Sequence, residues 1–122
     1  MNNRPAVIVF DVNETLSDVS QMAEQFLEVG APADLAAMWF AGLLRDGFAL
    51  ATTGDSEKFA AIGAGVLHGP LRDVDLNTGL AEAAGHIMSG LDGLVAHPDV
   101  VDGVWALRAA GFRLGTLSNG ST

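Results

Sequence analysis

The sequence predicts an α/β protein in which a block of helices interrupts a parallel sheet. Residues 6–10 and 112–117 form two short apolar runs, rich in the side chains that strands buried on both faces of parallel sheets carry. Between them, residues 17–96 are rich in Ala, Leu and Gly and follow a helical periodicity. We therefore expect a partial α/β core, made of residues 1–16 and 97–122, and an all-helical insertion over residues 17–96.

Composition narrows the classes of function. Hydrophobic residues make up 49% of the 122 residues, enough for a buried core. The net charge of −9 argues against nucleic acid or an anionic membrane as a partner, because both require clustered Lys and Arg. The absence of cysteine excludes a disulfide scaffold and a cysteine nucleophile. Residues 33–51 are interrupted by charges and no signal peptide is recognised, so we expect a cytoplasmic protein.

Apolar spacing locates the helices of the insertion. Leu35, Trp39, Leu43 and Leu50 form a stripe that predicts an amphipathic helix between Pro32 and Thr52. Residues 56–67 and 80–89 predict two further helices, with residues 75–78 capping the later one. We expect four aromatic side chains to pack in the interior, with Phe40 also suited to contact a substrate: Trp39, Phe40, Phe48 and Trp105.

A further helix is predicted before the second strand. Pro98 suits its first turn, Asp99 and Asp102 favour its N-terminal dipole, and Gly111 ends it. Its inward face is expected to consist of three apolar residues: Val100, Val104 and Leu107.

Polar side chains follow both predicted strands. Asp11 ends the first strand, and Ser118 and Asn119 follow the second. The carboxyl ends of neighbouring parallel strands face one crevice, where a carboxylate can attack carbon or phosphorus and a hydroxyl can hold an anionic group. We expect a small anionic substrate there. Helix or turn capping is the alternative role for Asp11, Thr15 and Ser118, and Asn119-Gly120 is also a common turn dipeptide.

Two motifs resemble those of a known family. Residues 10–16, Phe-Asp-Val-Asn-Glu-Thr-Leu, resemble motif I of the haloacid dehalogenase (HAD) superfamily, and residues 117–121, Leu-Ser-Asn-Gly-Ser, resemble motif II. Residues 97–114 resemble the segment before motif II in the type II (S)-2-haloacid dehalogenase branch. The resemblance implies a Rossmann-like HAD core with a helical cap, and hydrolysis of a 2-haloacid to a 2-hydroxy acid.

The resemblance also implies roles for individual residues. Asp11 corresponds to the nucleophile, and Thr15 to a hydroxyl that supports its carboxylate. Ser118, Asn119 and the backbone N–H of Val12 correspond to groups that hold the substrate carboxylate, with Asn119 also near the departing halide. The type II branch requires no metal, so no cofactor is expected.

Three positions depart from the family pattern. Asn13 stands where HAD phosphatases carry a second Asp, and an amide cannot act as a general acid or base, which disfavours the alternative of a Mg²⁺-dependent phosphatase. Dehalogenases commonly carry Tyr at the position of Asn13 and Gly at that of Glu14. Their cap has Arg after Trp, whereas Phe40 follows Trp39 here. We assign Asn13 and Phe40 to substrate binding.

The family's lysine and acid cluster, motifs III and IV, lie after motif II. None of the six basic residues stands at such a position: Arg4, Arg45, Lys58, Arg72, Arg108 and Arg113. A sheet of two strands is expected to leave open edges and an uncovered apolar face. A third reading is therefore an inactive domain that forms a homodimer through its cap helices.

Overall fold

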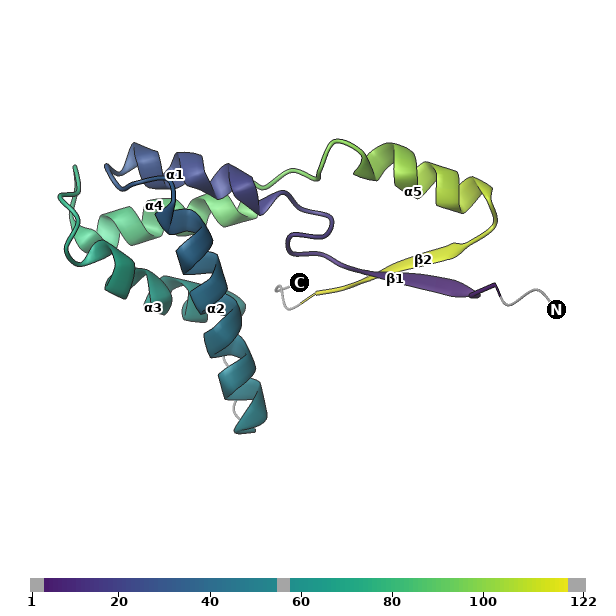
Figure 1. Ribbon diagram of the computed structural model, residues 1–122, viewed down its shortest axis with the longest axis horizontal. Helices are drawn as coiled ribbons and strands as arrows, with labels where there is room; N and C mark the ends of the chain where they lie inside the picture. The colour runs from purple at the N-terminus through teal and green to yellow at the C-terminus, as the bar shows by residue number, and fades with distance from the viewer. Residues whose placement is uncertain (1–3, 55–57, 119–122) are drawn as a thin grey trace. The chain divides into compact units, whose positions relative to one another are not determined.

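The computed structural model describes residues 4–54 and 58–118, which divide into two compact units (Figure 1). The sheet unit contains the residues up to Val19 together with Leu94–Ser118, and the helical unit contains Ser20–Gly93. No helix in the described ranges is long and apolar enough to cross a membrane.

The sheet unit contains two parallel strands joined to one helix (Figure 1). Strand β1 (Val7–Asp11) pairs with β2 (Arg113–Leu117), in a register that runs from Val7 opposite Arg113 to Asp11 opposite Leu117. Helix α5 (Val100–Ala109) precedes β2. The predicted α/β class and the parallel pairing are confirmed.

Helix α5 lies against one face of this sheet. The alternate residues Ile8 and Phe10 are half-buried, and Phe10 lines a cavity of about 190 Å³ together with the predicted inward side of α5. On the other face, exposed fractions are 44% for Val7, 58% for Val9 and 72% for Leu117. The expectation of strands buried on both faces is therefore wrong within the sheet unit, because its described residues contain no second α-helix. The expected uncovered face is present.

The end of α5 is set by Gly111, as the sequence predicted. Its φ of +89° is left-handed, and its N–H and that of Phe112 donate to carbonyls of the last helical turn. The Arg4 guanidinium donates to the Ala110 carbonyl and lies 3.9 Å from the centre of the Phe112 ring. Trp105 is 62% exposed, so its predicted burial is wrong: it points away from the inward face of α5.

The described residues of the helical unit form four α-helices (Figure 1). They are α1 (Met22–Glu28), α2 (Leu35–Thr52), α3 (Phe59–Leu71) and α4 (Leu80–Asp92). The sequence predicted α2, α3 and α4 but not the short α1. The largest fully buried side chains of its core are Met22, Phe26, Trp39, Leu43, Leu67, Leu71 and Ile87.

Trp39 links three helices of this core. Its ring is fully buried, its indole N–H donates to the Gly63 carbonyl at 2.9 Å, and its ring centre lies 6.0 Å from that of Phe26. A Cβ added at Gly63 would lie 3.1 Å from the Met88 Cε atom, so a larger residue there would require the end of the Met88 side chain to shift. Phe48 is 62% exposed, which contradicts its predicted burial, because it lies on the outer side of α2.

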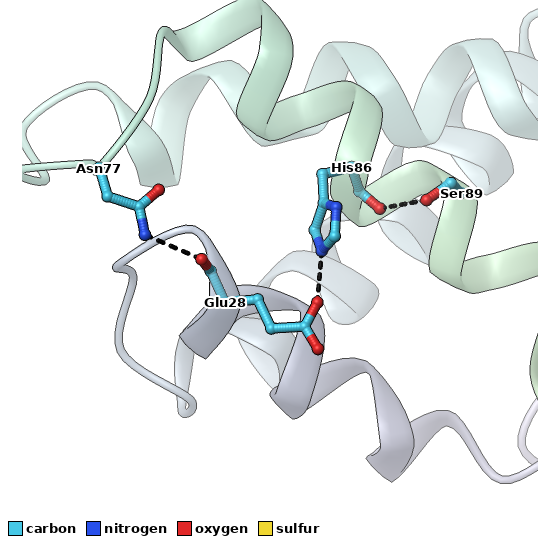
Figure 2. Close-up of polar contacts among 4 residues, drawn as sticks. All are labelled: Glu28, Asn77, His86 and Ser89. Carbon is cyan, nitrogen blue, oxygen red and sulfur yellow. Dashed lines mark hydrogen bonds and ion pairs between the residues drawn. The ribbon is translucent and has the colours of Figure 1, made fainter.

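Polar contacts join α1 to α4 at the surface (Figure 2). The Glu28 carboxylate lies 2.5 Å from His86 Nε2, and the Asn77 amide donates to the Glu28 carbonyl at 2.8 Å. The predicted capping of α4 by residues 75–78 is wrong. The cap position is Gly79, and the Thr78 hydroxyl bonds instead to the Glu82 carboxylate at 2.6 Å.

Candidate active site

The carboxyl ends of β1 and β2 bring two of the predicted site residues to one edge of the sheet. Asp11 is the last residue of β1 and pairs in register with Leu117, so Ser118 directly follows its partner. Both residues are exposed at this edge. Asn119 lies outside the described residues. A carboxylate and a hydroxyl thus flank the position where parallel sheets hold their ligands.

The turn after β1 is tightly bonded around Val12. The Val12 N–H donates to the Asp11 Oδ1 atom at 2.9 Å. The Val12 carbonyl accepts from the backbone N–H of Leu16 at 2.9 Å and of Ser17 at 3.0 Å, and from the Ser17 hydroxyl at 3.2 Å. The N–H that the resemblance assigns to the substrate carboxylate is therefore directed at the Asp11 carboxylate.

Thr15 and Asn13 lie in the same turn. Thr15 borders the 190 Å³ cavity, together with Phe10, Asp99 and apolar side chains of α5. Asn13 is half-buried and forms an isolated bridge with Ser17. Both residues are thus part of the loop that leaves Asp11.

Sequence reasoning missed the role of Glu14. Its φ is +66°, a left-handed conformation that favours glycine, which is the residue dehalogenases commonly carry at this position. The Glu14 carboxylate accepts from the Val19 N–H at 3.1 Å, and its carbonyl lies 3.3 Å from His97 Nε2. The glycine that dehalogenases commonly carry where Glu14 stands was the available signal for a left-handed turn.

Phe40 belongs to the helical unit. It is half-buried on α2, and its ring centre lies 6.4 Å from that of Trp39. Arg45, further along α2, pairs with Asp46 at 2.9 Å on the exposed surface. Helices α2 and α3 also line a largely apolar groove of about 570 Å³: Asp46, Ala49, Leu50, Thr53, Ile62, Gly65 and Val66. No group of three or more His, Asp or Glu residues suited to a metal occurs within the described ranges.

The chain has a partial Rossmann-like fold with a helical cap. Three features define it: the parallel strands, α5 before the second strand, and the helical block after the first strand. Solved structures similar to this chain include dehalogenases. One dehalogenase superposes with a TM-score of 0.85 at 27% identity, covering 99% of this chain and 54% of that one. An L-2-haloacid dehalogenase gives 0.82 at 26% identity, covering 94% and 53%. The predicted resemblance to the haloacid dehalogenases is confirmed.

A more distant relative shows the fold alone. The L-2-haloacid dehalogenase from Xanthobacter autotrophicus gives a TM-score of 0.77 at 24% identity, covering 97% of this chain and 48% of that one. That enzyme has also been solved with chloropropionic acid covalently bound. The present chain thus spans about half the length of the dehalogenases it matches. No family model matches the sequence, and comparison with curated proteins gave no significant match.

Proposed function

We propose that this chain is a 2-haloacid dehalogenase of the HAD type, with Asp11 as its nucleophile. The observation that supports the proposal is the register of the two strands, which pairs Asp11 with Leu117, the residue before Ser118, at the carboxyl edge of a parallel sheet. The similarity in fold to dehalogenases supports the same reaction class.

In the first step, an Asp11 Oδ atom attacks C2 of the 2-haloacid from the side opposite the halogen. The carbon–halogen bond breaks, halide leaves with the bonding electron pair, and an ester joins Asp11 to C2 with inverted configuration. The Ser118 hydroxyl holds the substrate carboxylate, which keeps C2 within reach of the nucleophile. The Val12 N–H, which donates to the Asp11 Oδ1 atom, orients the nucleophile. Asn119 supports the same carboxylate or the departing halide, and Thr15 supports the Asp11 carboxylate.

In the second step, water attacks the carbonyl carbon of the ester. The bond between this carbon and the ester oxygen breaks, the 2-hydroxy acid leaves, and the Asp11 carboxylate forms again with one oxygen from water. The water loses both protons: one goes to the released oxygen of the 2-hydroxy acid and the other goes to solvent. Asn13 and Phe40 contribute contacts to the substrate, and the reaction involves no metal or other cofactor.

Halide release from (S)-2-chloropropionate tests the proposal. Asp11→Asn removes the nucleophile, and we expect its rate to fall to the background measured without protein. Asp102→Asn is the matched control, because it removes an exposed carboxylate from the first turn of α5 and should retain the wild-type rate. Halide release that survives Asp11→Asn would contradict the proposal.

Two further assays separate the alternatives. Mg²⁺-dependent release of phosphate from a phosphate monoester would favour the phosphatase alternative. Asn13 disfavours this alternative, because an amide cannot act as a general acid or base. No turnover of either substrate, together with a mass that rises with protein concentration, would favour an inactive domain that self-associates through its helices.

A further inference from the structure

Glu14 has a backbone conformation that its side chain disfavours. It is the one non-glycine residue with positive φ among the described residues, at +66°. In this region the Cβ atom crowds the following carbonyl oxygen, so an ordinary residue stays there only where its surroundings hold it. The contacts of Glu14 therefore indicate what holds the turn after the nucleophile.

Both ends of Glu14 are bonded. Its carboxylate accepts from the Val19 N–H at 3.1 Å, which anchors the far end of the turn. Its carbonyl oxygen lies 3.3 Å from His97 Nε2. Because a carbonyl oxygen only accepts, Nε2 must carry the hydrogen of this bond.

His97 is itself attached to the turn by its backbone. The His97 N–H donates to the Leu16 carbonyl at 2.9 Å, and the Asp18 N–H donates to the Val95 carbonyl at 2.9 Å. The His97 Nδ1 atom also faces the Asp18 carboxylate at 4.0 Å. Residues 95–97 thus lie alongside the turn and bond to it at several points.

The connection continues to the nucleophile through Leu16. The Leu16 carbonyl accepts from His97, and the Leu16 N–H donates to the Val12 carbonyl at 2.9 Å. The N–H of the same Val12 donates to the Asp11 carboxylate at 2.9 Å. A series of hydrogen bonds therefore connects His97 through Leu16 to Val12, whose N–H faces the Asp11 carboxylate.

We propose that Glu14 and His97 are positioning residues that hold the turn after Asp11, so that the Val12 N–H remains directed at the reacting carboxylate. Their role in catalysis rests on the proposed function. Their role in holding the turn does not, since the contacts belong to the sheet unit itself. The two roles are therefore measured separately.

Amide hydrogen exchange of the full chain, followed by NMR, tests the role in the turn. We expect Glu14→Ala and His97→Ala to lower protection of the Val12 and Leu16 amides by about tenfold or more, because each removes a bond that closes the turn. Glu14→Gln retains an oxygen acceptor, and His97→Gln places an amide donor near the position of the His97 Nε2 atom. Both glutamine variants should therefore retain most of the wild-type protection of these amides. His86→Ala removes a comparable histidine contact in the helical unit and is the control.

Unchanged protection at Val12 and Leu16 in both alanine variants would overturn the proposal. An equal loss across all amides of both units would also overturn it, because that indicates general destabilisation. In the halide assay, both alanine variants should lower kcat more than they raise KM, and the glutamine variants should recover kcat. A wild-type chain that releases no halide but shows the expected exchange pattern supports the role in the turn and contradicts the dehalogenase activity.

Discussion

Leu43→Ala is expected to destabilise the helical unit strongly, because Leu43 is fully buried in its core. Removing three carbons loses about 2.4 kcal/mol of transfer free energy, at about 0.8 kcal/mol for each buried methylene. The remaining cavity adds up to about 2 kcal/mol where the neighbours do not collapse into it. The total, about 2–4 kcal/mol, corresponds to a fall in Tm of about 10 °C or more for a unit of this size.

The chain offers a matched control and a local reporter. Leu27 on α1 is 57% exposed, so Leu27→Ala should cost about 0.5 kcal/mol or less. Of the two tryptophans, Trp39 is buried in the helical unit and Trp105 lies on α5 of the sheet unit. In a Trp105→Phe background, fluorescence therefore follows the helical unit alone during urea unfolding. Equal losses for the two leucine variants would refute the assignment of Leu43 to the core.

Three other predictions concern single contacts. Trp39→Phe removes the indole N–H that the Gly63 carbonyl accepts, so urea unfolding should show a loss of about 1–3 kcal/mol; no loss would contradict the bond. Ser118→Ala should raise KM for a 2-haloacid more than it lowers kcat, if Ser118 holds the substrate carboxylate, whereas Ser89→Ala should change neither constant. His86→Ala removes an exposed side-chain contact to Glu28 on α1 and should cost about 1 kcal/mol or less; a larger cost would mean that this contact contributes to the core.

The parts of the fold that could be predicted are those that depend on local patterns. Apolar runs that end in a polar residue located both strands, and parallel pairing then required Asp11 and Ser118 to share one edge of the sheet. The glycine stop after α5 was also predictable, since its left-handed conformation is local. Strand positions and the candidate edge therefore followed from short segments of sequence.

The parts that were missed depend on contacts distant in the chain. His97 and Glu14 are 83 residues apart, and they meet through a backbone carbonyl, which leaves no pattern of side-chain types. The exposure of Phe48 and Trp105 was not predicted. Helical periodicity shows which residues share a face of a helix, but it does not show whether that face is covered. The short α1 also lacks a side-chain cap that would mark its beginning.

The central claim is that the Asp11 carboxylate becomes esterified and is then hydrolysed. The most direct measurement is turnover of (S)-2-chloropropionate in water enriched in oxygen-18, with protein in excess, followed by mass spectrometry of the peptide that contains Asp11. We predict that Asp11 gains oxygen-18 and that the 2-hydroxy acid formed in this single turnover carries ordinary oxygen. Oxygen-18 in the product of that first turnover, with an unlabelled Asp11, would mean that water attacks C2 directly and would contradict the claim.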